Sequence, residues 1–472
     1  MSPMFEQIAA ASVAILHLLV AASITAHVLL TKRDIGSSIG WIGIGWLAPF
    51  AGGLLYLVFG VNRVTRRAQR LRPRRPIGGP RHVTPRTEPE DKHLLPLERA
   101  ALRITQRPAE PGNRIEILHQ GDEAYPRMIE AIRAAEHTIA LSSYIFRADQ
   151  AGQGFIEALI DAHGRGVTVR VLLDGIGSGY FHAPAAGRLR RGGVPTAQFM
   201  HSPLPWRMPF LNLRTHKKIL CVDGRIGFTG GLNIGDENVL ERDPRVKVRD
   251  THFAVEGPIV SQLVEAFAED WLFATGEALD GGGWFPSLHP AGAVTARVVT
   301  SGPDEDLEKI EFLALQAIGL ADTSLSIMTP YFLPDERMIT GLALAAMRGV
   351  AVDIIIPAES NHGFMDWAMR AQIGPLLAAG CRIWRNPPPF DHSKLMTIDG
   401  AWSLVGSANW DMRSFRLNFE LNMALSSPEF AREIEALMAA KRIDRLTGND
   451  LDRRSLPVRL RDAGIRLLLP YL

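Results

Sequence analysis

The sequence predicts two tandem α/β domains of similar fold, preceded by a two-helix transmembrane hairpin. Three observations indicate this. Strand and helix signals alternate from about Arg114 onward, long segments recur within the chain, and two apolar stretches dominate the first 60 residues. A chain of 472 residues is long enough for two or three domains. We expect a hairpin (1–62), a basic Pro/Arg-rich linker (63–108), two domains (109–285 and 286–450) and a C-terminal segment (451–472).

The two apolar stretches cover residues 8–30 and 35–60, and neither contains Lys, Arg, Asp or Glu. A run of that length is sufficient to cross a bilayer. The four polar residues between the stretches, 31–34, predict a tight turn. A cleaved signal peptide would need a positive start, but Glu6 is the only charged residue among the first seven. Two buried helices of a soluble core would not require such long charge-free runs.

Flanking charges predict the orientation of this hairpin. Seven arginines lie between Arg63 and Arg75, whereas the turn contains only Lys32 and Arg33. The positive-inside rule then places the N-terminus and everything after Gly60 in the cytoplasm. The same arginines would attract anionic lipid head groups. We therefore expect a multi-pass membrane protein whose catalytic domains are cytoplasmic.

Composition excludes several classes of function. A net charge of +2 argues against a surface built to bind nucleic acid. Cys221 and Cys381 both lie in apolar runs, which predicts buried, reduced thiols and no disulfide framework. The chain also lacks the acidic clusters or His-x-x-x-His spacing of a metal site, so we expect neither metal nor cofactor. Residues 71–91 are rich in Pro, Arg and Gly, which predicts an extended or disordered linker.

An internal repeat is the most informative feature of the chain. Three segments recur in the same order, too far apart for a solenoid. This predicts two similar α/β domains, each with a largely parallel sheet, packed face to face. The matched segments are HTIALSSYIFRAD (137–149) with SLSIMTPYFLPD (324–335), RGVTVRVLLD (165–174) with RGVAVDIIIP (348–357), and THKKILCVDGRIGFTGGLN (215–233) with DHSKLMTIDGAWSLVGSAN (391–409).

The third segment carries a motif with identical spacing in both copies. Its His and Lys are two residues apart on a predicted strand and therefore share a face. Its Asp precedes Gly, a strong hairpin-turn signal, so by geometry alone this Asp is structural. Its Asn follows the hairpin and can lie beside the His–Lys pair. The residues are His216, Lys218, Asp223 and Asn233 in the first copy, and His392, Lys394, Asp399 and Asn409 in the second.

Two such copies brought together would suit phosphodiester chemistry. Imidazoles act as nucleophiles and as general acids or bases near neutral pH. Two lysines and two asparagines can bind phosphate oxygens and stabilise the charge of a transition state. Such a site needs no metal.

These motifs resemble those of the phospholipase D superfamily, whose signature is H-x-K-x(4)-D-x(6)-G-[GS]-x-N. Within it, the chain resembles bacterial cardiolipin synthases with two membrane spans, over nearly its whole length. The resemblance includes the hairpin and arginine run, together with NIGDE (233–237), RDTH (249–252), SGPD (301–304), TPYFLPD (329–335) and RSFRLNFE (413–420). It implies a pseudo-twofold pair of phospholipase D-like domains, an active site at their interface, and a bacterial inner-membrane location.

The resemblance also implies roles for the motif residues. One histidine forms a phosphohistidine while the other protonates the leaving group. We assign His216 as the nucleophile and His392 as acid and then base, although the near-equivalence of the motifs leaves the reverse open. Lys218, Lys394, Asp223 and Asp399 complete the catalytic set of the signature.

A nucleophilic imidazole needs an acceptor that orients its other nitrogen. We predict Glu420 for that role and Asp250 as its counterpart in the first half, the alternative being surface or strand-edge charges. The second motif departs from the family, which often has an apolar residue before the histidine, because Asp391 stands there. This carboxylate either raises the pKa of His392 or points to the other face.

The expected reaction joins two phosphatidylglycerol molecules into cardiolipin and releases glycerol. The alternative is a hydrolytic phospholipase D that uses water as acceptor. A nuclease of the superfamily would not need a hairpin, and a scaffold with a dead enzyme domain would not need two complete motifs. We expect phosphatidylglycerol, other anionic phospholipids and the membrane as partners, and no nucleic acid. Phosphatidylethanolamine as second lipid, and oligomerisation, stay open. Residues 460–472 either dip into the membrane interface or pack on the core as a helix.

Overall fold

A computed structural model describes residues 3–31, 34–60, 92–201, 213–304 and 306–467. The chain separates into two compact units, Met1–Leu71 and Arg72–Leu472. The linker predicted for residues 71–91 and the arginine run lie outside the described residues.

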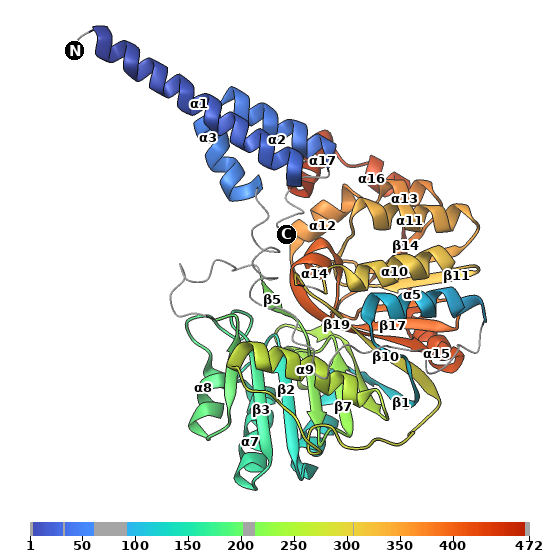
Figure 1. Cartoon of the computed structure of the whole chain (residues 1–472). Helices are drawn as coiled ribbons and strands as arrows, with labels where there is room; N and C mark the ends of the chain where they lie inside the picture. Colours follow the sequence, from blue (N-terminus) through green and yellow to red (C-terminus); the bar gives the residue numbers. More distant parts are fainter. Residues whose placement is uncertain (1–2, 32–33, 61–91, 202–212, 305, 468–472) are drawn as a thin grey trace. The chain divides into compact units, whose positions relative to one another are not determined.

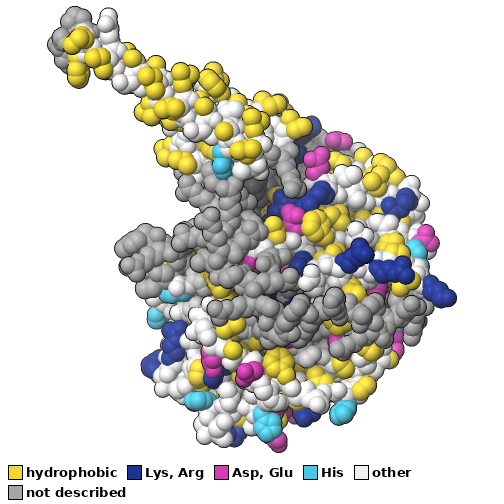
Figure 2. Space-filling model, viewed as in Figure 1, with side chains coloured by type: hydrophobic (Ala, Val, Ile, Leu, Met, Phe, Trp, Pro, Cys, Tyr) yellow, Lys and Arg dark blue, Asp and Glu magenta, His cyan; other side chains and the backbone are white. Residues whose placement is uncertain are grey.

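The N-terminal unit begins with one long apolar helix. Helix α1 (Pro3–Thr31) contains a stretch, Gln7–Thr31, that is long and apolar enough to cross a membrane. Its surface carries many exposed apolar side chains (Figure 2). Helix α2 (Ile35–Leu47) follows, and Asp34 caps its start by accepting the amide of Ser37 at 2.6 Å. Of the described helices, α1 alone has the length and composition of a membrane span.

The second apolar stretch is not one continuous helix, which corrects the sequence prediction. Helix α2 has 13 residues, fewer than a span needs, and is followed by α3 (Pro49–Leu55) and a π-helical turn, η1 (Tyr56–Gly60). The break falls at Ala48, where φ is −142°, because a proline disfavours helical geometry in the preceding residue. That this stretch crosses the membrane therefore stays a prediction.

In the described part of the second unit, sixteen strands form one mixed sheet (Figure 1). Its two halves have the same internal order, which is the repeat seen in three dimensions. The first half runs β1-β9-β7-β6-β2-β3-β4, with β5 at the side, and comprises β1 (Glu110–His119), β2 (Thr138–Ser143), β3 (Thr168–Asp174), β4 (Thr196–Phe199), β5 (Arg214–Thr215), β6 (Ile219–Val222), β7 (Ile226–Gly230) and β9 (Thr251–Glu256).

The second half runs β10-β19-β17-β16-β11-β13-β14-β20. Each of its strands except the last matches one of the first half in position and order. The strands are β10 (Val294–Ser301), β11 (Ser324–Met328), β13 (Ala351–Pro357), β14 (Arg382–Asn386), β16 (Leu395–Ile398), β17 (Trp402–Gly406), β19 (Asn418–Ser426) and β20 (Asp444–Leu446).

The halves meet edge to edge rather than face to face. Strand β1 pairs antiparallel with β10, so that Glu110 lies opposite Ala296. If the β1 and β10 edges were unpaired, their backbone N–H and C=O groups would lack hydrogen-bond partners. The pairing of the two strands satisfies these groups in both halves. The predicted largely parallel sheet is also wrong. Along the main path, only β2-β3-β4 and β11-β13-β14 are parallel, because hairpins connect many of the other strands.

The hairpins β6–β7 and β16–β17 turn at the two Asp-Gly pairs, as predicted. φ is +52° and +61° at Asp223 and Gly224, and +53° and +59° at Asp399 and Gly400. Positive φ at both central positions is what a type I′ turn requires. In each hairpin the amide two residues after the Asp donates to the carbonyl of the residue before it, at 3.0 and 3.1 Å.

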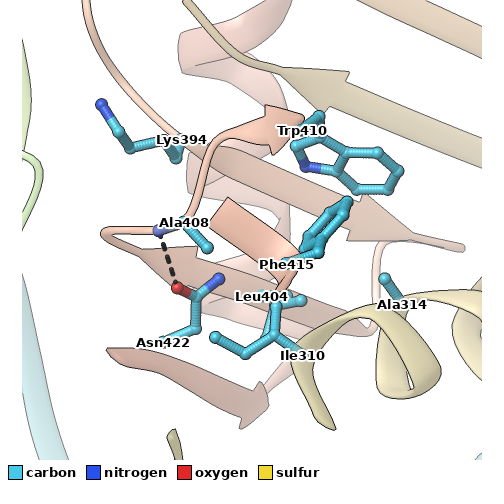
Figure 3. Close-up of a pocket in the computed structure, with 8 residues that line it drawn as sticks. All are labelled: Ile310, Ala314, Lys394, Leu404, Ala408, Trp410, Phe415 and Asn422. Atoms are coloured by element: carbon cyan, nitrogen blue, oxygen red, sulfur yellow. Dashed lines mark hydrogen bonds between the residues drawn. The ribbon is translucent and has the colours of Figure 1, made fainter. Parts of the chain in front are cut away.

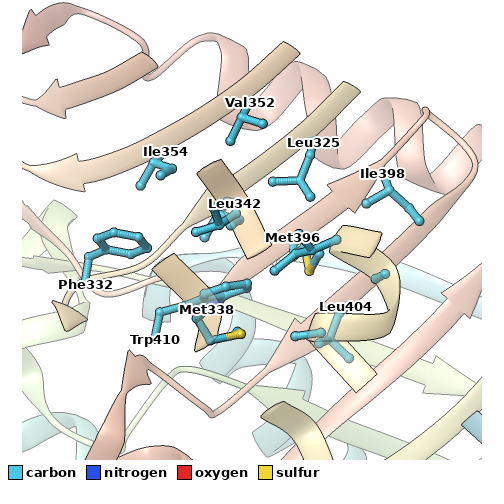
Figure 4. Close-up of a cluster of buried hydrophobic side chains, with 14 of the residues drawn as sticks. Leu325, Phe332, Met338, Leu342, Val352, Ile354, Met396, Ile398, Leu404 and Trp410 are labelled. Carbon is cyan, nitrogen blue, oxygen red and sulfur yellow. The ribbon is translucent and has the colours of Figure 1, made fainter. Parts of the chain in front are cut away.

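Helices cover both faces of the sheet. Strand β3 shows why: Val169, Val171 and Leu173 enter one core and Leu172 enters another. On one face, helices cover the first half and a second group covers the second half, where, together with α5 (Leu95–Thr105), they enclose the core drawn in Figure 4. These are α6 (Gln120–Ala134), α7 (Gln150–Gly164) and α8 (Pro184–Arg191), then α10 (Lys309–Leu320), α11 (Glu336–Met347), α12 (Gly363–Arg370) and α13 (Gly374–Ala378).

On the opposite face, α9 (Val260–Thr275) and α15 (Pro428–Ala439) cover a single core shared by both halves. Val255 from the first half and Leu421 from the second belong to this core, and both are fully buried. Cys221, also in this core, and Cys381 are both buried free thiols, as predicted. The shared core makes the two halves parts of one folded unit.

Two segments at the margins of the second unit form helices. Helix α5 (Leu95–Thr105) lies within the segment predicted as linker, but Leu97 and Ala101 enter the core of the second half. Its apolar residues recur at helical spacing, a signal that the Pro/Arg composition concealed. Helix α17 (Leu456–Arg466) packs on α12, where the Arg461 guanidinium lies 4.0 Å from the ring centroid of Trp367. The described C-terminal residues therefore form a helix on α12, and contact of this segment with the membrane interface stays a prediction.

Candidate active site

Two short strand pairs cross between the halves and position the motif histidines. Strand β5 runs parallel to the start of β19, with Thr215 opposite Phe419. The next residue along the first chain segment is His216, whose amide donates to the Phe419 carbonyl at 2.8 Å. The first motif is therefore attached by backbone hydrogen bonds to the second half.

The second motif repeats this arrangement in reverse. Strand β15 (Phe390–Asp391) runs parallel to β8 (Val248–Arg249), with Asp391 opposite Arg249. The amide of His392 donates to the Arg249 carbonyl at 2.8 Å. The second motif is therefore attached to the first half.

In both strand pairs, an acidic residue directly follows the residue that accepts the histidine amide. Glu420 follows Phe419, and its Oε2 lies 3.0 Å from Nδ1 of His216. Asp250 follows Arg249, and its Oδ2 lies 2.8 Å from Nδ1 of His392. Both carboxylates are buried, so neither is a surface charge. Each imidazole is thus oriented by the carboxylate of the opposite half.

The two imidazoles differ in how firmly their tautomer is set. Nδ1 of His216 also lies 3.2 Å from the carbonyl of Ser407, so both of its neighbours are acceptors. Nδ1 must then carry the proton, which leaves a lone pair on Nε2. Nδ1 of His392 lies 2.8 Å from the ammonium of Lys394 as well as from Asp250. That nitrogen has one acceptor and one donor beside it.

The two histidine rings, which are nearly perpendicular, line one cavity of about 860 Å³. Their centroids are 6.4 Å apart, and each has a tyrosine set edge-on to it at 4.9 Å and 6.2 Å respectively. A cavity of this volume accommodates a lipid head group. Its lining draws on both halves: Tyr144, His216 and Asn233 from the first, and Tyr331, His392 and Asn409 from the second.

The two asparagines lie beside the histidines in this lining, where the sequence placed them. Oδ1 of Asn233 accepts the amide of Ile145 at 3.2 Å. Oδ1 of Asn409 is buried and has no hydrogen-bond partner among the described residues. Tyr144 and Tyr331 escaped the sequence analysis, although they occupy matching positions in the first repeated segment.

The motif lysines lie behind the histidines rather than in the lining of this cavity. Nζ of Lys218 donates to the His216 carbonyl at 2.6 Å, and Nζ of Lys394 donates to the His392 carbonyl. Burial lowers the pKa of Lys218 to about 7 and that of Lys394 to about 8. Both charges are therefore sensitive to pH near neutrality.

Lys394 also borders a separate cavity of about 10 Å³, room for roughly one water molecule. Its amino end points away from the rings of Trp410 and Phe415, which close the other side (Figure 3). There Asn422 accepts the amide of Ala408 at 3.1 Å. This cavity is too small for any part of a lipid.

Burial also governs the imidazoles. It lowers the pKa of His216, and together with the Lys394 charge it lowers the pKa of His392 to about 4. Burial raises the pKa of Asp250 and Glu420, but the neighbouring cations outweigh it and bring both below their ordinary values. Near pH 7 the empty site therefore contains two neutral imidazoles and two charged carboxylates.

The G-[GS] position of the signature faces these carboxylates. A Cβ atom on Gly231 would lie 2.0 Å from Oδ1 of Asp250, so no larger residue fits there. The matching residue of the second half is Ser407, whose hydroxyl donates to Oε2 of Glu420 at 2.5 Å. The glycine makes room for one carboxylate and the serine holds the other.

Asp223 and Asp399 lie in the turns, where their carboxylates bind backbone amides, and their place in the catalytic set stays a prediction. The Asp223 carboxylate accepts the amides of residues 136–138 at 2.7–3.0 Å. The Asp399 carboxylate accepts those of residues 322–324 at 2.8–3.0 Å and the Thr323 hydroxyl at 2.9 Å. Both fasten a hairpin to the loop before a central strand.

Asp391 points away from the imidazole beside it. Its Oδ2 lies 2.6 Å from Nζ of Lys441, and its Oδ1 accepts the amide and the hydroxyl of Ser393. The pKa of His392 is lowered, not raised, because burial and the Lys394 charge dominate. Of the two alternatives for this acid, the structure supports the other face.

Comparison with known proteins finds the same two-part arrangement. A family model described as "Cardiolipin synthase, PLD-like domain" matches residues 128–271 and 314–441. The chain is 35% identical to the cardiolipin synthase of Geobacillus sp. (strain WCH70), over 94% of this chain and 90% of that one. It is 34% identical to cardiolipin synthase A of Pseudomonas aeruginosa (strain LESB58), over 93% and 91% respectively.

Among solved structures, the phosphatidylserine synthase of Haemophilus influenzae Rd KW20 has a similar fold. The TM-score is 0.59 at 15% identity, over 80% of this chain and 100% of that chain. At this identity, the likeness concerns the fold alone.

The turn carboxylates give a first prediction. Asp399→Asn preserves the tolerance for positive φ but removes the charge that holds three amides. We expect the free energy of unfolding to fall by about 1–3 kcal/mol, while the folded variant retains a catalytic rate within a few-fold of the parent. Thermal melting and steady-state assays in one detergent would measure both, with the exposed Asp322→Asn as control. A rate loss of 100-fold at unchanged stability would place Asp399 in the catalytic set.

Proposed function

This chain belongs to the cardiolipin synthase family of phospholipase D-like proteins, and we propose that it joins two phosphatidylglycerol molecules into cardiolipin and glycerol. It is a phosphatidyltransferase with phospholipid substrates in a membrane. The observation that supports the reaction best is the pair of opposed imidazoles, each oriented by the carboxylate of the other half. Such a pair can provide a nucleophile on one side of a phosphate and an acid on the other.

In the first step, Nε2 of His216 attacks the phosphorus of one phosphatidylglycerol. The P–O bond to glycerol breaks, and His392 donates a proton to the departing oxygen. The fixed Nδ1 proton of His216 supports its assignment as the nucleophile, because it leaves the Nε2 lone pair available. The product of this step is a phosphatidyl-histidine.

Protonation of His392 before this step follows from the substrate itself. The imidazole is neutral in the empty site, since its pKa is about 4. A phosphodiester anion beside it favours the imidazolium form and raises that pKa. The proton needed by the leaving glycerol is thus taken up when the lipid binds.

In the second step, a second phosphatidylglycerol replaces the glycerol. His392, now neutral, removes the proton of its terminal hydroxyl, and the oxygen attacks phosphorus as the P–N bond breaks. The asparagines of both motifs bind the phosphoryl oxygens in each step, and the lysine charges behind the histidines stabilise the negative charge on those oxygens from a distance. One phosphodiester is exchanged for another, so the reaction should be readily reversible.

The acceptor must be a lipid hydroxyl rather than water. Exclusion of water from the site, together with a high local concentration of lipid at the membrane, favours transfer over hydrolysis. We infer that the hairpin provides this anchoring, that the catalytic unit is cytoplasmic, and that the protein lies in a bacterial inner membrane. The hydrolytic alternative would use the same residues and differ only in product.

Product analysis tests the proposed function. The purified full-length protein in phosphatidylglycerol vesicles is expected to form cardiolipin and glycerol in a 1:1 ratio. His216→Ala and His392→Ala should each lower the rate by at least about 1,000-fold, because each removes a group that reacts in both steps. Thin-layer chromatography of labelled lipid would measure this, with the exposed His289→Ala as a matched control. Phosphatidic acid as the main product would make the protein a hydrolase.

The lowered lysine pKa values predict an alkaline limit. Each ammonium is present below its pKa and lost above it, about 7 for Lys218 and about 8 for Lys394. Hence kcat/KM, which reports the free enzyme, should fall about tenfold or more between pH 7 and pH 9. Lys394→Arg retains its charge throughout, so its profile should fall less steeply than that of the wild type. A flat wild-type profile would contradict the role of these cations.

A further inference from the structure

The two ends of the cavity are chemically different, although their backbones match. Arg214 precedes His216 by two residues in β5, and Phe390 precedes His392 by two in β15, so each shares the face of its histidine. Across the paired strands, Arg214 lies opposite Asn418 and Phe390 lies opposite Val248. All four side chains line the cavity. The strand residues that flank His216 are therefore polar and cationic, and those that flank His392 are apolar.

A second arginine accompanies Arg214 in this lining. Arg413, from α14 (Met412–Arg416), lines the same cavity. Both arginines thus line one cavity, and burial, followed by the charge of Arg214, lowers the pKa of Arg413. Both also interact electrostatically with Tyr144, which lies edge-on to His216. The pair therefore lies beside the imidazole assigned as nucleophile.

Part of the Arg214 guanidinium group is left without a hydrogen bond. Its Nη1 is buried and has no hydrogen-bond partner among the described residues. Asp174, a buried acid that interacts electrostatically with Arg214, uses its carboxylate to accept the amides of Ile176, Gly177 and Thr215 at 2.7–2.9 Å. A buried donor without an acceptor costs free energy, which a ligand oxygen would recover. The arrangement suits an anionic ligand that enters the cavity.

The proposed reaction requires such a ligand. The acceptor phosphatidylglycerol has a phosphodiester of its own, three carbons from the hydroxyl that attacks. While the donor phosphate lies between the histidines, this second phosphate must lie about one glycerol length away. Two residues along a strand span about 6–7 Å, so Arg214 is at the right distance from His216. A guanidinium also matches the oxygens of a phosphodiester in a bidentate manner.

We propose that Arg214 and Arg413 form a second phosphate subsite, which binds the phosphodiester of the acceptor phosphatidylglycerol. This inference rests on the proposed function. In this arrangement the acceptor lipid lies at the His216 end of the cavity. The subsite binds the phosphate of an anionic lipid, which favours the hydroxyl of that lipid over water as the acceptor. The same subsite holds the second phosphate of cardiolipin in the reverse reaction.

The test compares two acceptors in the full-length protein. Cardiolipin formation uses an acceptor with a phosphate, whereas exchange of labelled glycerol into phosphatidylglycerol uses the same donor and an acceptor without one. We expect Arg214→Gln and Arg413→Gln each to lower the ratio of cardiolipin formation to glycerol exchange by about tenfold. Arg214→Lys, which keeps the charge but loses the bidentate geometry, should recover part of that ratio. Arg245→Gln, an exposed arginine at the same cavity, is the matched control and should leave the ratio within twofold.

The outcomes separate this inference from the function on which it rests. Variants that lose both activities in equal proportion, or that retain the wild-type ratio, would overturn the subsite. A wild-type protein that exchanges glycerol but forms no cardiolipin would overturn the proposed function, and the subsite with it. A ratio that falls equally in Arg245→Gln would show a general effect of charge and would also overturn the subsite.

Discussion

The active site depends on the crossed strand pairing, in which each histidine segment forms backbone hydrogen bonds with the other half. Because Thr215 lies opposite Phe419, the following Glu420 comes within 3.0 Å of His216, and the equivalent pairing brings Asp250 within 2.8 Å of His392. A slip of one residue in either pair would turn the carboxylate to the other face. A single half would therefore contain an imidazole without its orienting acid, which explains why both copies of the motif and their shared core are needed.

This pairing also balances the buried charges. Two carboxylates and two ammonium groups lie in the site, and the two imidazoles beside them are neutral. Buried charges are tolerable when they are compensated in this way. A phosphodiester changes the balance by one negative charge, and the imidazole that takes up a proton restores it. In the proposed reaction, substrate binding therefore also protonates the general acid.

Much of the site could be predicted from the sequence, because the repeat and the motif spacing specify local geometry. The period of a strand places His and Lys on one face, and Asp-Gly predicts the type I′ turn that the φ values confirm. Turn geometry predicted a structural role for Asp223 and Asp399. Their place in the catalytic set was predicted from the family signature alone. The side chain of Arg214 was overlooked because it lies just before the repeated segment, and that of Arg413 because RSFRLNFE has no counterpart among the repeated segments.

Other features depend on pairing between distant segments, which periodicity does not specify. To predict that the halves join edge to edge through β1 and β10, one must know which strand of each half has an unpaired edge. The hydrophobic pattern of the sequence does not specify this. The interruption at Ala48 was signalled by Pro49, but the absence of charge over residues 35–60 outweighed that signal in the prediction. Helix α5 was hidden by the basic, proline-rich sequence that precedes it.

The central claim is that His216 with Glu420 provides the nucleophile, whereas His392 with Asp250 provides the acid and base. A donor lipid with a good leaving group tests this claim directly. With a phosphatidyl ester of p-nitrophenol, the first step needs no acid, so it should require His216 and Glu420 but not His392 or Asp250. Stopped-flow absorbance is expected to show a burst of nitrophenol, equal to the enzyme concentration, in Asp250→Asn and no burst in Glu420→Gln. A burst in Glu420→Gln and none in Asp250→Asn would contradict the account and place the nucleophile on His392.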